Sequence, residues 1–203
     1  MDYKTKSDEY FSKPVIAIGG SAGSLREAVK IVEELPNDLN AVVFVAMHRA
    51  YDKDSQLEAI LAKSSKLNVK TVQDGDHVDL ASIHISNPGE VIGMDRNGKV
   101  TSQFDYKLEK RTKNIDELFA SIAAAADGNT IGVVLSGCLQ DGSEGLKKIK
   151  EMGGIALVQD PTEAEFSYMP DFAIKKNKDI DFVGSSEEIA KAIVWYAENP
   201  DLW

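Results

Sequence analysis

The 203-residue sequence predicts an α/β fold: a doubly wound, mostly parallel sheet between two layers of helices, with a peripheral antiparallel hairpin. Short runs of apolar residues without charges are typical of strands buried on both faces of a parallel sheet. These runs alternate with segments that carry apolar residues three and four positions apart, as amphipathic helices do. Asn97-Gly98 between two further runs predicts the hairpin, because this pair tolerates the positive φ angles of a tight turn.

The first half of the chain begins with a polar stretch, 1–13, which we interpret as a flexible tail before one domain at 14–203. Apolar runs predict strands, and the stripe that ends at Pro36 predicts the first helix. The expected strands are 15–18, 41–47, 68–72 and 81–86, with helices at 25–35 and 55–62 and hairpin strands at 91–94 and 99–104.

The second half continues the alternation of helices and strands. The expected elements are helix 115–126, strand 130–135, helix 143–152, strand 155–158, a helical segment 166–174 broken at Pro170, strand 180–183 and a terminal helix from 185 or 186 to 198. Ser24, Asn114 and Ser143 are expected N-caps, and Glu27 would complete a capping box with Ser24.

Composition excludes several classes of protein. A formal net charge of −10 argues against a nucleic-acid partner, since phosphate backbones bind clustered positive charge. The apolar runs are shorter than the roughly 20 residues that cross a bilayer, and the N-terminus does not resemble a signal peptide. We therefore expect a cytoplasmic protein without membrane insertion. The single cysteine excludes an internal disulfide.

The glycine-rich turn at 19–23, Gly-Gly-Ser-Ala-Gly, follows the first predicted strand and precedes a helix. It matches the nucleophile-elbow pattern, in which flanking glycines permit a turn that exposes the hydroxyl of Ser21. It also resembles the phosphate-binding turn of a dinucleotide fold, or it is a βα turn without chemistry. The turn alone leaves all three interpretations open.

Three polar residues follow strand ends of the predicted sheet: Ser21, His48 and Asp141. In open α/β sheets, functional groups gather at the carboxyl ends of strands. A serine needs a neighbouring imidazole to accept its proton and a carboxylate to hold that imidazole in the correct tautomer. These three residues supply that set. His84, inside a predicted strand, and His77, on a turn, are better explained as structural or exposed residues.

His48 also argues against dinucleotide binding. That fold places an acidic residue at the end of its second strand to hold the ribose hydroxyls, whereas the second strand here ends in His48-Arg49.

Several motifs together resemble the catalytic domain of the chemotaxis protein-glutamate methylesterase (CheB) family, over about 15–194. These motifs are Ile18-Gly19-Gly20-Ser21-Ala22-Gly23, His48 after the second strand, Ile83-x-Ile85-x-Asn87-Pro88-Gly89, Ile115-Asp116-x-Leu118-Phe119, Gly132-Val133-Val134-Leu135-Ser136-Gly137 leading to Asp141-Gly142, and Met169-Pro170.

The resemblance implies a serine hydrolase that removes methyl esters from glutamate side chains of methylated chemoreceptors or related signalling proteins, releasing methanol, and that deamidates certain glutamines. It implies a catalytic triad of Ser21, His48 and Asp141, in an order different from the Ser, Asp, His of α/β-hydrolases. Backbone N–H groups at Cys138 and Ala22 are the candidates for binding the oxyanion. No metal and no organic cofactor is expected.

The sequence departs from the family pattern around the expected cleft. Ala22 stands where threonine is common, Arg49-Ala50 replaces Met-Pro, Thr112-Lys113-Asn114 replaces Arg-Pro-Ser, and Cys138 replaces methionine. Family members commonly carry an N-terminal receiver domain. Since only a short tail precedes the first strand, we expect this chain to lack one and to be regulated by a separate protein. Alternative interpretations are a weakly active or non-catalytic signalling module of the same fold and a small-molecule carboxylesterase.

Overall fold

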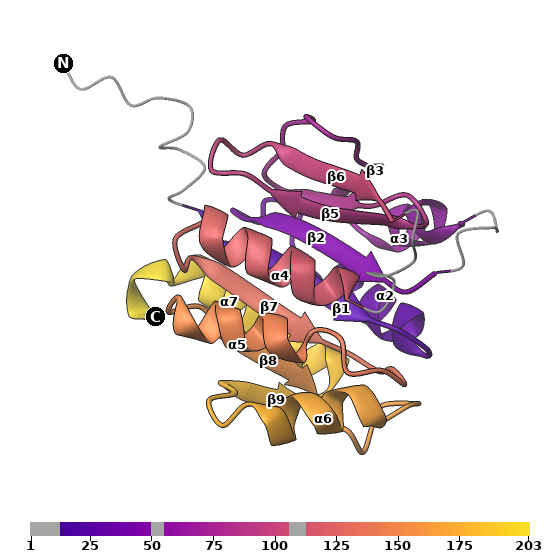
Figure 1. The fold of residues 1–203 in the computed structure, drawn as a ribbon, viewed down its shortest axis with the longest axis vertical. Helices are drawn as coiled ribbons and strands as arrows, with labels where there is room; N and C mark the ends of the chain where they lie inside the picture. Colours follow the sequence, from indigo (N-terminus) through magenta and orange to yellow (C-terminus); the bar gives the residue numbers. More distant parts are fainter. Residues whose placement is uncertain (1–12, 50–54, 106–112) are drawn as a thin grey trace.

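A seven-stranded parallel sheet forms the centre of the computed structural model, which describes residues 13–49, 55–105 and 113–203 (Figure 1). The strand order is β3-β4-β2-β1-β7-β8-β9, and every neighbouring pair is parallel. The strands are β1 Val15–Gly20, β2 Val42–Met47, β3 Asn68–Thr71, β4 Ser82–Ile85, β7 Thr130–Val134, β8 Ile155–Gln159 and β9 Phe182–Gly184. The predicted doubly wound parallel sheet is confirmed. Most of the predicted tail, 1–13, lies outside the described residues.

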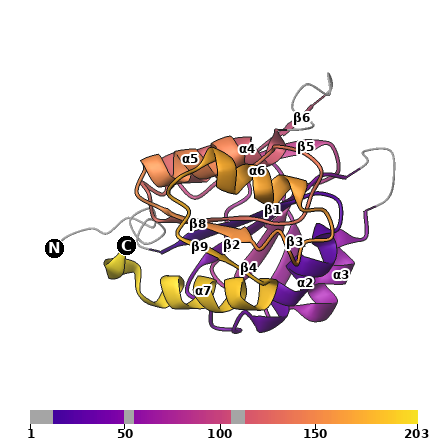
Figure 2. The same ribbon diagram turned by 90° about the horizontal axis from the view of Figure 1, so that it is seen from below.

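Helices cover both faces of the sheet (Figure 2). One face carries α2 Ser24–Glu34, α3 Leu57–Ser64 and α7 Ser186–Glu198, and the other carries α4 Asn114–Ala125, α5 Ser143–Glu151 and α6 Tyr168–Lys176. A short 3-10 helix, η1 Pro200–Leu202, follows α7. Each face buries its own apolar cluster because alternate residues of the central strands point to opposite sides: Ile16 and Ile18 belong to one cluster, Val15 and Ala17 to the other.

The predicted hairpin is the separate two-stranded antiparallel sheet of β5 Glu90–Met94 and β6 Val100–Phe104. Asp95 stabilises its turn, because one carboxylate oxygen accepts the backbone N–H groups of Asn97 and Lys99 at 2.8 and 2.9 Å. The hairpin packs against α4 (Figure 1).

Three of the predicted helix caps are wrong. Helices α2, α4 and α5 begin at Ser24, Asn114 and Ser143 themselves, and no side chain caps any of them. A glycine with positive φ precedes both α2 and α5, and the two serine hydroxyls instead donate to the carbonyls three residues back, at 2.6 Å each. Each serine thus closes a tight loop before its helix.

The predicted break at Pro170 is also wrong. Helix α6 runs through it, because Pro170 lies in the first turn, where a backbone N–H has no intrahelical acceptor. The terminal helix α7 begins with a capping box formed by Ser185 and Glu188, whereas the capping box predicted at Ser24 and Glu27 is absent. In the described part of the chain, no helix combines the length and apolarity that crossing a membrane requires.

His84 is a structural residue, as its place in a strand predicts. Its fully buried ring donates from Nδ1 to the Val43 carbonyl at 3.0 Å and accepts the Asp79 N–H at Nε2, at 3.1 Å. This pattern requires the neutral ring. Burial lowers the pKa of His84 to about 4, with Lys70 lowering it further and the Val43 carbonyl and Asp79 acting against the shift.

Candidate active site

Ser21 lies directly after β1, in the turn that joins this strand to α2. Its backbone N–H donates to the Ser136 carbonyl at 3.0 Å, and its carbonyl accepts the N–H of Ser24 at 3.1 Å. Gly23, with φ 76°, allows the turn to enter α2, and a Cβ there would lie 2.8 Å from the Ser136 hydroxyl. The turn thus holds a half-buried serine between two strand ends.

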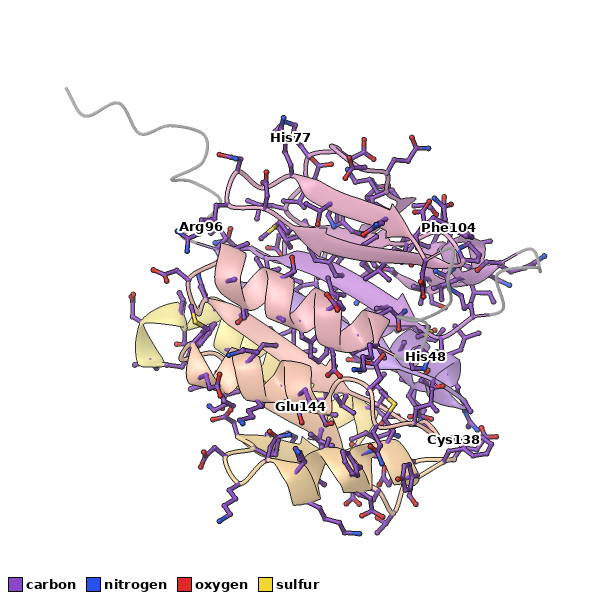
Figure 3. All side chains as sticks on the ribbon, viewed as in Figure 1. His48, His77, Arg96, Phe104, Cys138 and Glu144 are labelled. Atoms are coloured by element: carbon purple, nitrogen blue, oxygen red, sulfur yellow. The ribbon has the colours of Figure 1, made fainter. Side chains whose placement is uncertain are left out.

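His48 occupies the corresponding position after β2. Gly20 pairs with Met47 in the parallel register of β1 and β2, and the His48 N–H donates to the Gly20 carbonyl at 3.2 Å. Ser21 and His48 therefore follow paired positions on adjacent strands. Figure 3 shows His48 at the same edge of the molecule as Cys138, which belongs to the loop after β7.

Asp141 reaches His48 from the other side of β1. Its Oδ2 atom lies 2.7 Å from His48 Nε2, and the carboxylate is fully buried. Oδ2 also accepts the Ile115 N–H at 3.0 Å, while Oδ1 accepts the N–H groups of Asp116 and Gly142 at 2.9 Å each. The three backbone N–H groups, two of them at the start of α4, together with the N–H at His48 Nε2, stabilise the negative charge of Asp141 and fix its orientation.

His48 contacts Asp141, but the Ser21 hydroxyl and the His48 ring do not form a hydrogen bond with each other. With Nε2 donating to Asp141, Nδ1 is the ring nitrogen that remains to accept a proton. Nδ1 is buried and has no hydrogen-bond partner in the described part of the chain. Rotation of the Ser21 or His48 side chain has to bring the Ser21 hydroxyl to Nδ1. In apo structures, such catalytic hydrogen bonds are often long or not yet formed.

The loop after β7 supplies both the aspartate and the surroundings of Ser21. A Cβ at Gly137 would lie 2.9 Å from the Cβ of Ser21 and 2.5 Å from the sulfur of Met169, so a side chain there would displace them. Cys138 and Ala22 are exposed. Neither backbone N–H donates a hydrogen bond within the described ranges, so both are available to an oxyanion.

Ser136 holds several loops of the site together by hydrogen bonds. It lies within one of the sequence motifs, but the motif did not indicate this structural role. Its buried hydroxyl donates to the Ala22 carbonyl at 2.8 Å and accepts the Phe166 N–H at 3.0 Å. Its own N–H donates to Oε1 of Gln159, a buried polar residue at the end of an apolar strand. Ser136 thereby joins the turn after β1 to the segment before α6. The polar end of the 155–159 run is the sequence signal that could have revealed this network.

Asp116 is a second carboxylate beside Asp141. In the sequence it was identified only as part of a motif, with no role of its own. Its Oδ1 accepts the Gly145 N–H of α5 at 2.7 Å. Burial raises the pKa of Asp116 to about 6, and the neighbouring Asp141 charge adds to this shift, while bonds from Gly145 and Gly142 oppose it. Asp116 thus connects the starts of α4 and α5 around Asp141.

His84 and Asp116 predict opposite effects of acid on stability. Unfolded His84 binds a proton near pH 6.5 and the folded ring only near pH 4, so acidification across this window lowers the free energy of unfolding by roughly 3 kcal/mol. Folded Asp116 takes up its proton near pH 6 and the unfolded residue near 3.8, so acidification through that window stabilises the fold. Partial exposure of Asp116 reduces its effect.

We therefore expect D116N to lose stability more steeply than wild type between pH 6.5 and 4, and H84Q to lose it less steeply. Urea unfolding at half-unit pH steps measures both slopes. Equal slopes for the wild type and both variants would contradict the assigned shifts.

A groove of about 490 Å³ lies beside the Asp141 loop. Tyr168 and Phe172 of α6 form an aromatic side of it, with ring centroids 6.2 Å apart, and the Tyr168 side chain is half exposed. Cys138 and Asp141 line the same groove. Its volume is within the range of ligand-binding clefts, and it adjoins the candidate catalytic residue Asp141.

Comparison with known proteins identifies the family. Residues 16–193 match the family model described as CheB methylesterase. A curated relative from Leptospira interrogans is 29% identical over 184 residues, which cover 91% of this chain and 95% of the relative. The protein-glutamate methylesterase/protein-glutamine glutaminase 3 of Pseudomonas aeruginosa is 30% identical over 156 residues, covering 77% of this chain and 47% of that protein.

The fold comparison agrees. The crystal structure of the Thermotoga maritima CheB methylesterase catalytic domain superposes with a TM-score of 0.81 at 26% sequence identity, covering 89% of this chain and 97% of that one. The sequence resemblance and the predicted fold class are both confirmed.

Proposed function

The chain belongs to the CheB methylesterase family, and on this basis we propose that it hydrolyses glutamate γ-methyl esters in chemoreceptor-like proteins with Ser21, His48 and Asp141 as its catalytic triad. The observation that carries the proposal is the buried 2.7 Å contact between His48 Nε2 and Asp141 Oδ2 at the strand end next to Ser21. A role as general base explains why His48 Nδ1 has no hydrogen-bond partner among the described residues.

In the proposed reaction, the Ser21 hydroxyl attacks the ester carbonyl as His48 Nδ1 accepts its proton. Asp141 holds the Nε2–H tautomer and stabilises the imidazolium. The oxyanion accepts hydrogen bonds from the Ala22 and Cys138 N–H groups. Methanol departs with the proton from His48, and water, deprotonated by the same nitrogen, hydrolyses the glutamyl-serine ester to regenerate Ser21.

The substitutions at positions 22, 49, 114 and 138 alter the expected cleft but leave this triad intact. The proposed partner is a methylated receptor segment in the groove beside α6. Deamidation of glutamine, included in the names of the curated relatives, would follow the same path with ammonia as the leaving group.

Methanol release from a synthetic peptide with one glutamate γ-methyl ester tests the proposal. We expect multiple turnovers without added metal or cofactor. p-Nitrophenyl acetate is the control for a small-molecule esterase, which would hydrolyse this ester and leave the peptide intact. Binding of methylated peptide without turnover of either compound would indicate the non-catalytic module.

A further inference from the structure

Helices α4 and α5 pack side by side on one face of the sheet (Figure 1), and both begin next to Asp141. The first N–H groups of a helix have no acceptor within it, so an acceptor normally comes from a side chain at the N-cap. Neither helix has one there. Lys113, before α4, carries no acceptor atom, and Gly142, before α5, has no side chain.

Each helix start instead receives a carboxylate from the other segment. Asp141, in the loop before α5, accepts the N–H groups of Ile115 and Asp116 in α4 at 3.0 and 2.9 Å. In return, the Asp116 carboxylate accepts the Gly145 N–H in the first turn of α5 at 2.7 Å. The two aspartates therefore hold the two helix starts together, and one of them belongs to the proposed triad.

Close packing explains why this exchange replaces local caps. Gly142 has a φ of 87°, and a Cβ there would lie 2.9 Å from the Val134 side chain, so the position directly after Asp141 has no room for a capping residue. A Cβ at Gly145 would lie 3.0 Å from the Cα atom of Asp116. The absence of a side chain at Gly145 thus lets α4 come close enough for Asp116 to bond its N–H.

The exchange places two carboxyl groups side by side, which opposes their ionisation. Burial raises the pKa of Asp116 to about 6 and the charge of Asp141 adds to this effect, while the N–H groups of Gly145 and Gly142 act against it. At pH 8 Asp116 is therefore ionised, and a carboxylate accepts an N–H more strongly than a neutral group does. A second carboxylate maintained beside Asp141 at this cost indicates a role in the site.

We propose that Asp116 is a positioning residue for the catalytic base and acts through Asp141. By holding the start of α5 against α4, it fixes residues 141 and 142, so that Asp141 Oδ2 stays 2.7 Å from His48 Nε2. The inference rests on the proposed function and adds a residue to its mechanism. Misplacing a catalytic group by about 1 Å can slow a reaction about 100-fold, so the loss of this support should be measurable.

Steady-state kinetics of D116A and D116N at pH 8, with the glutamate γ-methyl ester peptide, test the role. In D116A the Gly145 N–H loses its acceptor, and we expect kcat to fall about 100-fold. KM should change by less than about threefold, because the loss affects the orientation of the base rather than binding of the ester. D116N keeps an oxygen for the Gly145 N–H, so its kcat should recover to within about tenfold of wild type.

D181A is the matched control, because Asp181 holds the opposite end of α5. Its carboxylate accepts the Ala156 N–H at 2.8 Å and pairs with Lys150, in the last turn of the helix, at 2.7 Å. D181A should lower the melting temperature, as D116A does, and keep the wild-type kcat and KM. An Asp116 that only stabilised the fold would give the same result as Asp181.

All variants are compared as folded proteins, below their melting temperatures. The inference would be overturned by a kcat of D116A within about threefold of wild type, a loss confined to KM, an equal loss of kcat in D181A, or a D116N as slow as D116A. If D116A does not fold, D116S takes its place, because a serine side chain ends one bond short of Oδ1 and carries no charge.

Proton NMR of S21A separates this inference from the proposed function, because it needs no turnover. A ring N–H that donates to a carboxylate resonates far downfield, and its loss in S21A/H48Q assigns the signal to His48. We expect the signal in S21A and S21A/D116N, and its loss or an upfield move in S21A/D116A. Its absence from S21A, or an unchanged signal in S21A/D116A, would contradict the inference. If wild type releases no methanol, the proposed function fails and this measurement still decides the role of Asp116.

Discussion

S21A should release methanol from a glutamate γ-methyl ester peptide at least about 10⁴-fold more slowly than wild type, because removing a triad nucleophile leaves only the catalysis of the surrounding site. The expected loss is in kcat, since the hydroxyl acts on the reacting carbonyl. The fold should be unaffected, because the Ser21 side chain makes no hydrogen bond to the described residues. Steady-state kinetics and thermal melting measure the two effects.

S65A is the matched control for S21A, because Ser65 lies at the end of α3, and among the described residues its hydroxyl makes one hydrogen bond, accepting the Leu67 N–H. S65A should retain wild-type turnover. Comparable turnover by S21A and wild type would exclude Ser21 from the mechanism.

D141N has the second-largest expected effect, a loss of about 10³- to 10⁴-fold in kcat. An asparagine has only one acceptor oxygen. With this oxygen in the Oδ1 position, it keeps accepting the N–H groups of Asp116 and Gly142, and its NH2 group then lies at the Oδ2 position, facing the Ile115 N–H and His48. An NH2 turned toward His48 needs an acceptor at Nε2, which moves the ring proton to Nδ1. Nδ1 then cannot accept the Ser21 proton.

The exposed Asp38, in the loop between α2 and β2, provides the matched substitution for Asp141. D38N should have wild-type kinetics. Turnover by D141N within tenfold of wild type, with a normal melting temperature, would show that Asp141 does not orient the base.

The fold was predictable because its signals are local. Runs such as 15–18 and 41–47 are apolar on both faces, which only a central parallel strand explains. Candidate site residues were predictable for a related reason: Ser21, His48 and Asp141 each interrupt the sequence just beyond a buried strand. The topology of an α/β sheet brings such positions to one edge.

The packing behind contacts between distant segments was not predictable. The His48–Asp141 pair was expected, but the bond joins residues 93 positions apart and depends on α4 packing closely over β1, where a Cβ at Gly19 would clash with Ile115 Cγ2. The Ser24 cap was wrong because a glycine turn reversed the role of its hydroxyl from acceptor to donor.

Labelling with a fluorophosphonate, followed by mass spectrometry of the modified peptide, tests the central claim most directly. An activated serine forms a stable covalent adduct with this reagent, whereas an ordinary surface serine does not. We predict a stoichiometric adduct on Ser21 in wild type and almost none in H48Q. An adduct on another residue, or no adduct on folded wild-type protein, would contradict the account.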